Sequence, residues 1–239
     1  SSDLKGDKNL EKINEVLATM SQAEQTKIMD DMVGLQTHSD QEIGFWAQVG
    51  AIIKDNGGDF VRAAGMTLFI SIIGTFIGTF IGLLIGVFRT AKKSANRALA
   101  ILQTLVGWVI NIYVEIFRGT PMIVQSMVIY YGTAQAFGIN IDRTLAAIFI
   151  VSINTGAYMS EIVRGGIFAV DKGQFEAATA LGFTHGQTMR KIVLPQVVRN
   201  ILPATGNEFV INIKDTSVLN VISVVELYFS GNTVATQTY

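Results

Sequence analysis

Residues 65–88 read GMTLFISIIGTFIGTFIGLLIGVF, a run of 24 positions without a charged side chain. About 20 consecutive apolar residues are enough for a helix to cross the roughly 30 Å hydrocarbon core of a bilayer. The run is therefore predicted to be a transmembrane helix. A mean hydropathy of +0.41 and a charged fraction of only 15% agree with an all-α membrane protein, which is the expected fold class.

Four basic residues come directly after this first helix: Arg89, Lys92, Lys93 and Arg97. The positive-inside rule places them in the cytoplasm, and the basic loop at 164–199 with them. Four further apolar segments are predicted, at 98–117, 121–138, 144–163 and 206–229. Segment 144–163 must then cross from the outside to the cytoplasm. The chain is cytoplasmic at 89–97, so residues 98–143 are expected to cross the membrane an odd number of times. Either one of their two apolar runs spans the membrane, or the two runs together form one span.

Those two runs are separated by Arg118-Gly119-Thr120-Pro121. Thr120 suits the N-cap of a helix, and Pro121 suits its first position. We therefore expect a helix that is interrupted within or near the membrane. Counting membrane crossings from the cytoplasmic loops toward the start of the chain predicts an extracytoplasmic N-terminus. Counting toward the end of the chain places Tyr239 outside as well.

The first 60 residues differ in charge from the rest of the chain. They contain five lysines and eleven acidic residues, whereas residues 61–239 contain thirteen basic and eight acidic ones. Residues 1–33 are predicted to form two short amphipathic helices outside the membrane. Residues 34–58 are expected to be a linker with a short interfacial stretch, and residues 59–239 to be the transmembrane domain.

The first transmembrane helix has a glycine at every fourth position: Gly74, Gly78, Gly82 and Gly86. This spacing gives the helix a continuous small face on which another helix can pack closely. The sequence allows this face to contact either a second subunit or another helix of the same subunit. A contact within the same subunit is favoured.

Ionisable side chains at membrane depth are costly and therefore mark candidate sites. Six fall in the apolar segments or beside them: Glu115, Arg118, Glu161, Arg164, Lys214 and Asp215. Glu115 and Arg118 are spaced to pair on one helix face. So are Glu161 and Arg164, and for this second pair a structural role is preferred. Lys214-Asp215 is expected to interrupt the last helix, either in a substrate path or as a hinge.

A functional role is preferred for the first pair. A helix that begins at Thr120 would direct its unbonded N–H groups and the positive end of its dipole into the protein, beside Arg118. That arrangement suits a substrate carboxylate. The predicted substrate path comprises Glu115, Arg118, Thr120, Pro121, Gln125, Glu161, Lys214 and Asp215.

The cytoplasmic loop contains Glu176-Ala177-Ala178, then Gly182, then Ile192-Val193-Leu194-Pro195. Residues 174–181 favour a helix, Gly182 can end it in the left-handed conformation, and a capping box at 184–187 can open a second helix. We expect two short helices that meet at an angle and project from the membrane. The alanines would let another protein approach closely, although the spacing alone is equally typical of an amphipathic surface helix.

This pattern resembles the EAA loop (EAA motif) of the membrane subunits of ABC-type importers, and all fixed positions of that loop are filled. The resemblance implies a type I ABC importer-like transmembrane helix bundle. In such a bundle the loop forms a cytoplasmic coupling helix that sits in a groove of the ATP-hydrolysing subunit. The residues implied in ATPase coupling are Glu176, Ala177, Ala178, Gly182, Ile192, Leu194 and Pro195.

Three further stretches, 117–121, 157–166 and 214–217, resemble the polar-amino-acid branch of these importers. The resemblance implies uptake of glutamine, glutamate, asparagine, arginine or histidine, by two permease subunits, identical or paralogous, and two ATPase subunits. Residues 5–10 and the helices after them resemble the last two helices of an extracytoplasmic amino-acid-binding protein, which some Gram-positive importers fuse to the permease. On this resemblance 1–33 is a remnant of a fused substrate-binding domain, and the last permease helix is expected to be missing.

No catalytic or metal site is predicted in this chain. It has no cysteine, its two histidines lie in different kinds of segment, and no glycine is followed by lysine as a phosphate-binding loop requires. ATP and Mg are therefore expected on the partner subunit. The chain itself is expected to have no catalytic site, but to be one component of an ATP-dependent amino-acid translocase.

The leading hypothesis is the transmembrane subunit of an ATP-driven amino-acid importer in the bacterial plasma membrane. The alternative is an ion-driven secondary transporter or channel, which has no need of a complete docking motif. A membrane anchor for an outer sensor domain is a third possibility, against which the buried charges and the broken helix argue. The basic residues lie in loops next to helix ends, which the membrane topology explains without a nucleic-acid partner.

Overall fold

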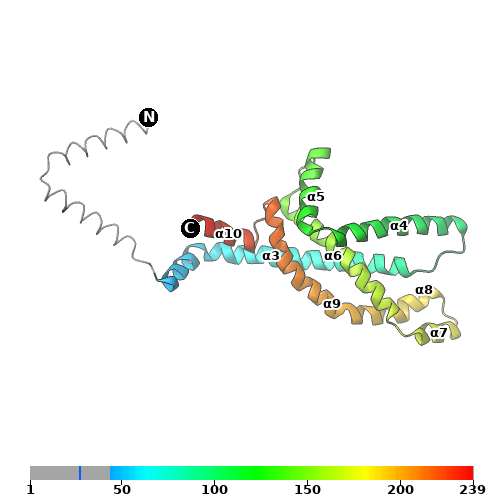
Figure 1. The fold of residues 1–239 in the computed structure, drawn as a ribbon. Coiled ribbons are helices and arrows are strands. Elements are labelled where there is room, and N and C mark those ends of the chain that lie inside the picture. Colours follow the sequence, from blue (N-terminus) through cyan, green and yellow to red (C-terminus); the bar gives the residue numbers. More distant parts are fainter. Residues whose placement is uncertain (1–26, 28–43, 239) are drawn as a thin grey trace. The chain divides into compact units, whose positions relative to one another are not determined.

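The computed structural model describes residue 27 and residues 44–238. They fall into two units, divided after Asp55, and each is considered by itself. Throughout these ranges the regular structure is helical (Figure 1), which confirms the expected all-α fold. The helix pair predicted in 1–33 lies, apart from Lys27, outside the described residues.

Helix α3 (Phe45–Thr90) contains the uncharged run. It begins well before that run, so the linker expected at 34–58 is helical from Phe45 onward. A glycine inside a helix costs only about 1 kcal/mol relative to alanine, and the Gly57-Gly58 pair therefore does not end it.

Helices α4 (Arg97–Gly119), α5 (Met122–Phe137) and α6 (Arg143–Phe168) follow close to the predicted segments. Local signals set their ends. The side chain of Asn96 accepts the N–H of the second residue of α4 at 3.0 Å, and Gly138, with a φ of +68°, ends α5.

Two short helices come next, α7 (Lys172–Ala180) and α8 (His185–Thr188). The chain then continues through one π turn, η1 (Met189–Val193), into α9 (Leu194–Asp215). The predicted pair of short helices is thus wrong in its second member, because the helix that opens at His185 runs on. Pro195 lies in the first turn of α9, where the wide turn before it accommodates a residue without an N–H group.

Helix α9 ends at the predicted interruption, Lys214-Asp215, and tightens there into a 3-10 helix, η2 (Thr216–Ile222). After a short break α10 (Leu227–Thr238) begins. The single helix expected at 206–229 is therefore three elements.

The glycine face of α3 packs against α6. The contacting pairs are Gly74 with Val151, Gly78 with Thr155, Gly82 with Met159 and Gly86 with Val163. A Cβ on Gly74, Gly78 or Gly86 would lie 2.5 to 2.6 Å from its partner's side chain, so the two helices can only come this close at glycine. From each contacting pair to the next, the residue number rises by four on both helices, so α3 and α6 run parallel. The favoured expectation of packing within one subunit is confirmed.

Three described helices, α3, α4 and α6, are long and apolar enough to span a bilayer. A fourth span is added if His185–Ile222 and Leu227–Gln237, bent by 57°, count as one broken helix. Because α3 and α6 point the same way, the chain between them must cross back an odd number of times. Helix α4 can do this alone, whereas α5 has only 16 residues.

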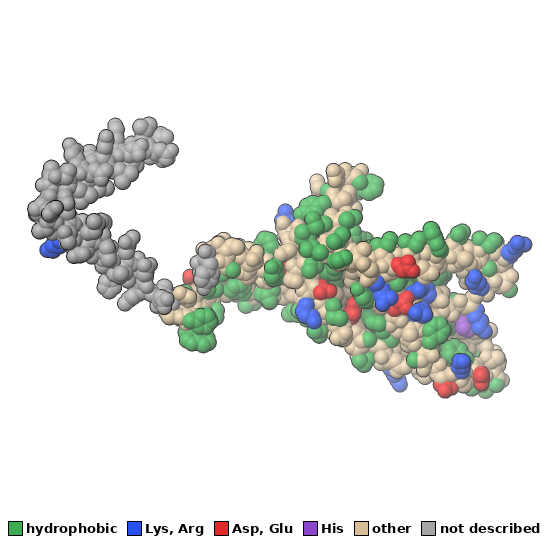
Figure 2. All heavy atoms as spheres, viewed as in Figure 1, with side chains coloured by type: hydrophobic (Ala, Val, Ile, Leu, Met, Phe, Trp, Pro, Cys, Tyr) green, Lys and Arg blue, Asp and Glu red, His purple; other side chains and the backbone are tan. Residues whose placement is uncertain are grey.

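Two buried clusters hold these helices together. One joins α3, α5, α6 and η2 around Ile70, Ile150 and Leu219. The other, called here the α6–α9 cluster, contains Met159, Val163, Ile167, Val170, Met189, Val193, Val197 and Ile201. Helix α4 differs, because Val114 is its single buried residue within the described chain. Its apolar side chains cover a long stretch of the surface in Figure 2, as expected for a helix that faces lipid or another membrane subunit.

Candidate functional site

The turn between α7 and α8 has the predicted geometry. The side chain of Asp171 accepts a backbone N–H at 2.6 Å and caps the start of α7. Gly182, with a φ of +80°, follows the end of that helix in the left-handed region, and its N–H donates to the carbonyl of Thr179 at 2.9 Å. Thr184 and Gln187 form the expected capping box of α8.

The motif residues on α7 divide between two faces of the helix. Glu176 and Ala177 are exposed, and Leu181, just beyond the helix, is 75% exposed. Ala178 is 1% exposed and is not accessible to another protein. The close approach expected through all the alanines is therefore restricted to the outer face.

The second half of the motif fixes the position of this turn. Val193 is fully buried in the α6–α9 cluster, and Leu194 and Phe175 pack against the same cluster from α9 and α7. Ile192 is partly buried, whereas Pro195 is exposed. The exposed turn is therefore attached firmly to the membrane helices α6 and α9.

The break between α4 and α5 is closed by Gln125. Its Nε2 donates to the carbonyl and the hydroxyl oxygen of Thr120, at 2.8 and 2.9 Å, and to the carbonyl of Phe117 at 3.0 Å. Its Oε1 accepts a hydrogen bond from Asn154 Nδ2 of α6 at 2.9 Å. Gln125 is 6% exposed, so both ends of its amide are used to hold the break in place.

The predicted N-cap at Thr120 is wrong by one residue. Pro121 is the flanking residue of α5, which begins at Met122. The Thr120 hydroxyl instead donates to the carbonyl of Ile116 at 2.7 Å, at the end of α4. Proline lacks an N–H group, so placing it just outside the helix leaves no donor unsatisfied.

Glu115 and Arg118 do not pair as predicted. Neither belongs to an ion pair in the described part of the chain, and both are exposed. The Arg118 guanidinium lies over the ring of Tyr158, 5.6 Å from its centroid. A cation–π contact of this kind orients the guanidinium while leaving its N–H groups accessible.

Glu161 binds two guanidinium groups. Its Oε2 accepts from Nε and Nη2 of Arg164 at 2.9 and 2.7 Å, which confirms the predicted pair. Its Oε1 accepts from Nη1 of Arg89 at the end of α3, a partner that the sequence does not predict. The carboxylate therefore ties the ends of α3 and α6 together.

A polar stripe follows one face of α9: Glu208, Asn212 and Asp215. Asn212 Nδ2 donates to the hydroxyl oxygens of Thr75 and Thr155, at 2.7 and 2.9 Å, and so links α9 to α3 and α6. Glu208 is only 6% exposed, and it forms no hydrogen bond or ion pair with any described residue. An acidic residue in a membrane helix whose carboxylate has no partner in the described chain is a strong candidate for ligand binding.

Glu208 and Glu226 were not predicted as site residues, although both lie in the apolar segment 206–229. Their acidic character at predicted membrane depth was the available signal. Glu226 is 1% exposed, and its carboxylate accepts the N–H groups of Tyr228 and Phe229 at 2.9 and 2.7 Å. It is therefore a cap at the start of α10. Glu208 alone of the two remains available to a ligand.

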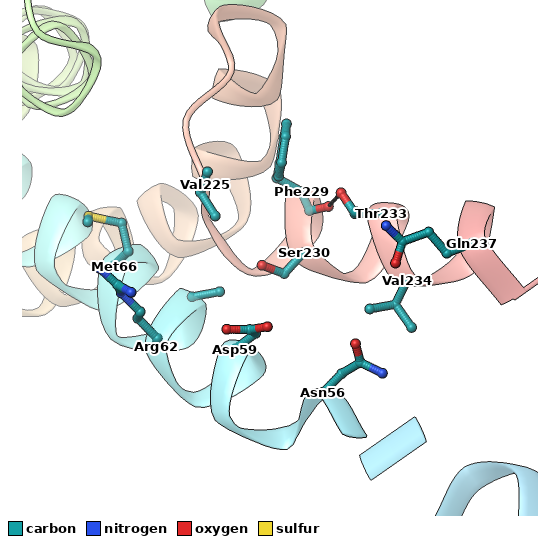
Figure 3. Close-up of a pocket in the computed structure, with 11 residues that line it drawn as sticks. Asn56, Asp59, Arg62, Met66, Val225, Phe229, Ser230, Thr233, Val234 and Gln237 are labelled. Atoms are coloured by element: carbon teal, nitrogen blue, oxygen red, sulfur yellow. Dashed lines mark hydrogen bonds between the residues drawn. The ribbon is translucent and has the colours of Figure 1, made fainter. Parts of the chain in front are cut away.

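A cavity of about 530 Å³ lies between α3 and α10 (Figure 3). Asp59 and Arg62 line it from α3, and Ser230, Thr233 and Gln237 line it from α10. Figure 3 shows Asp59 and Ser230 facing each other across it. The cavity lies at the end of α3 opposite to the basic loop, which the predicted topology makes the extracytoplasmic end.

The sequence profile of one protein family, described as the binding-protein-dependent transport system inner membrane component, matches residues 78–232. The match extends from the glycine face of α3 through the α7–α8 turn to α10, and it covers more than half of the chain. The chain belongs to this family. It is a membrane-embedded permease subunit, as the resemblance of its cytoplasmic loop implied.

Curated relatives of this permease transport amino acids. It is 40% identical over 176 residues to the glutamine transport system permease protein GlnP of Escherichia coli (strain K12), covering 72% of this chain and 74% of GlnP. It is 45% identical over 115 residues to the arginine transport system permease protein ArtQ of Bacillus subtilis (strain 168). That alignment covers 48% of this chain and 52% of ArtQ, about half of the relative's length.

Solved structures support the fold. The crystal structure of an amino acid ABC transporter with histidines matches with a TM-score of 0.66 at 36% identity, over 78% of this permease and 82% of that chain. The inward-facing MetNI methionine ABC transporter matches with a TM-score of 0.58 at 23% identity, over 74% and 87%, and supports the fold alone. The expected type I ABC importer-like permease fold is confirmed.

Permeases of this kind work with separate ATPase subunits and with a second permease subunit. Within the described part of the chain, no three histidine or acidic side chains come together as a metal site would require.

Proposed function

We propose that this permease is the membrane-spanning subunit of an ATP-driven importer for a polar amino acid. The glutamine and arginine permeases among its relatives support that substrate class. The observation that carries the coupling to ATP is the exposed α7–α8 turn, whose outer face presents Glu176, Ala177 and Leu181. This turn docks into a groove on a cytoplasmic ATPase subunit, which binds ATP and Mg.

The attachment of the turn supports its role in transmitting force. Phe175 and Leu194 pack against the α6–α9 cluster, and Asn212 ties α9 to α3 and α6. When the ATPase subunits close, a displacement of α7 moves these helices with it, because a packed core does not deform continuously. The helices then rock between outward and inward access.

The polar stripe of α9 and the α4–α5 break supply the substrate path. Glu208 attracts the ammonium group of the amino acid, since its own carboxylate lacks a partner among the described residues. Arg118 remains the candidate for the substrate carboxylate, and Gln125 holds the break that presents it. The path continues toward Lys214-Asp215, where α9 changes to a 3-10 helix.

An extracytoplasmic binding domain delivers the substrate, and residues 1–33 belong to such a domain. The cavity between α3 and α10 supports this direction of transport, because it lies at the predicted outer end and is lined by Asp59, Arg62 and Ser230. The second permease subunit is a copy or a paralogue of this one.

The test of this function is uptake by a reconstituted assembly. The full-length permease, its ATPase and any second permease are placed in liposomes that contain ATP and Mg, and uptake of labelled glutamine, glutamate, asparagine, arginine and histidine is measured. Uptake of at least one of them should require ATP and should not occur with ADP. Uptake driven by a sodium or proton gradient without ATP would instead establish an ion-driven transporter.

Replacing the unpartnered carboxylate of α9 tests the substrate path. Glu208→Gln keeps the shape of the side chain but removes its charge, so the KM for uptake should rise about tenfold or more, because a hydrogen bond to a charged group contributes about 1.5–3 kcal/mol. The comparison variant is Glu115→Gln, which removes the same charge from an exposed position on α4 that was also predicted to lie in the substrate path. If the KM rose only in Glu115→Gln, the substrate path would have to be assigned to α4 and not to α9.

A further inference from the structure

A second cavity, of about 480 Å³, lies where the end of α3, the following loop, α4 and the end of α6 meet. Three cationic side chains line it: Arg89, Lys93 and Arg164. Within the described chain, Glu161 is the one carboxylate that pairs with them, through both arginines. Three positive charges and one negative charge leave an excess of two positive charges around the cavity.

Several donors in this cavity have no partner among residues 44–238. Lys93 makes no hydrogen bond or ion pair there. Arg89 uses Nη1 toward Glu161, and Arg164 uses Nε and Nη2, so each guanidinium retains further N–H groups. The Gln103 side chain accepts the N–H of Ser94 at 2.8 Å and thereby fixes the loop that contains Lys93. These free N–H donors are suited to binding an anion, and the loop that carries Lys93 is held in place by Gln103.

An apolar groove of about 270 Å³ adjoins this cavity on α4. The cavity and the groove share Lys93 and Thr104, and the groove adds Arg97 and three hydrocarbon side chains, Ala100, Ile101 and Leu105. Trp108, which is 65% exposed, also lines the cavity and adds a large apolar surface to it. The cationic side chains near the helix end suit the anionic headgroup of a phospholipid, and the apolar side chains along the helix suit its acyl chain.

We propose that this cavity and groove form a binding site for an anionic phospholipid of the cytoplasmic leaflet. Its phosphate accepts hydrogen bonds from Lys93, Arg89 and Arg164, while an acyl chain lies on Ile101 and Leu105. Basic pockets between transmembrane helices at this surface suit anionic lipid headgroups. The positive-inside rule places the basic loop after α3 in that leaflet, and Figure 2 shows lysine and arginine side chains gathered near the start of α4.

The apolar groove distinguishes a lipid from a soluble anion. A free phosphate would satisfy the cations, but it would leave Ala100, Ile101 and Leu105 uncovered. A bound lipid would also neutralise the excess charge beside Glu161, at the point where that residue joins α3 to α6. Binding is therefore expected to stabilise the transporter, whichever amino acid it carries.

The experiment uses the assembled transporter with its ATPase subunits, delipidated in detergent. Its thermal unfolding midpoint is followed while phosphatidylglycerol, phosphatidylcholine, glycerophosphoglycerol or inorganic phosphate is added. Phosphatidylglycerol should raise the midpoint, and Lys93→Gln should weaken its apparent affinity about fivefold. The control, Lys92→Gln, removes the same charge from the neighbouring exposed lysine, which does not line the cavity, and should leave the affinity unchanged.

A second variant, Leu105→Ser, leaves every charge in place and should weaken phosphatidylglycerol binding while leaving any effect of phosphate unchanged. Equal losses in Lys93→Gln and Lys92→Gln would indicate diffuse attraction to the loop and would overturn the site. Stabilisation by glycerophosphoglycerol or inorganic phosphate equal to that by the intact lipid would assign the cavity to a soluble anion. Phosphatidylcholine as effective as phosphatidylglycerol would show that the cations are not used.

Discussion

Gly78→Val is expected to destabilise the permease strongly, whereas Gly65→Val on the same helix is not. A Cβ at residue 78 would lie 2.5 Å from Thr155 Cβ and 2.9 Å from the carbonyl oxygen of Ser152. The second of these atoms belongs to the backbone of α6 and cannot rotate away, so the two helices must separate. Overpacking a core costs about 1–3 kcal/mol and occasionally more, which is a large share of a total stability of about 5–15 kcal/mol.

Separation of α3 from α6 would have a further cost. Asn212 reaches Thr75 on α3 and Thr155 on α6 with the same side-chain amide. If the helices move apart, at least one of these buried hydrogen bonds is lost, and an unsatisfied buried polar group costs about 1–3 kcal/mol. The two penalties act together, because the threonines lie beside the glycines on the facing surfaces.

The measurement is the yield of monodisperse protein and its thermal midpoint in detergent. A Cβ added at residue 65 would have no neighbouring atom within 4 Å, and Gly65→Val therefore controls for adding the same side chain to α3. If Gly78→Val folded as well as this control and lost only its association with a second permease, the glycine face would be a contact between subunits.

Patterns that are local in sequence predicted much of this fold. An uncharged run long enough to span, a glycine every fourth residue and basic residues at the end of α3 each act through adjacent helical turns, so they can be read without knowing what packs where. The same holds for the α7–α8 turn. Gly182 and the capping box at 184–187 fix their own backbone geometry, and both were predicted correctly.

Errors arose where a local signal competes with a distant contact. The second helix of the loop was expected to be short, but the π turn before Pro195 and the burial of Val193 keep the chain helical into α9. At the α4–α5 break the sequence identified the interruption, yet the cap was misplaced by one residue. Gln125 and Asn154, on different helices, determine the geometry there.

The candidate site shows the same division. The Glu161–Arg164 pair lies within one helical turn and was predicted, whereas the bond from Arg89 joins residues 72 apart in sequence and was not. The sequence likewise could not show that Glu208 lacks a partner in the described chain while Glu226 has two, because that difference depends on which groups surround each carboxylate.

Gly182→Pro is expected to uncouple the permease from its ATPase while leaving the membrane helices folded. Proline fixes φ near −65°, and residue 182 has a φ of +80°. Proline also removes the N–H that donates to the Thr179 carbonyl at 2.9 Å. The α7–α8 turn cannot keep its shape, so the outer face that presents Glu176 is lost. Amino-acid-stimulated ATP hydrolysis should fall at least about tenfold, equivalent to about 1.4 kcal/mol or more of coupling.

Three measurements separate this effect from general misfolding: the thermal midpoint of the permease, capture of the ATPase, and stimulated hydrolysis. Gly186→Ala is the matched control, since it changes a glycine of the same turn region that has helical geometry and no atom within 4 Å of the added methyl. Glu176→Arg reverses a charge on the exposed face and should also lose the ATPase, without altering the turn. If Gly182→Pro and Glu176→Arg both kept full stimulation, the α7–α8 turn would not be the coupling element. Coupling would then have to pass through another cytoplasmic surface, and Ala178 and Val193 could not supply it because both are buried.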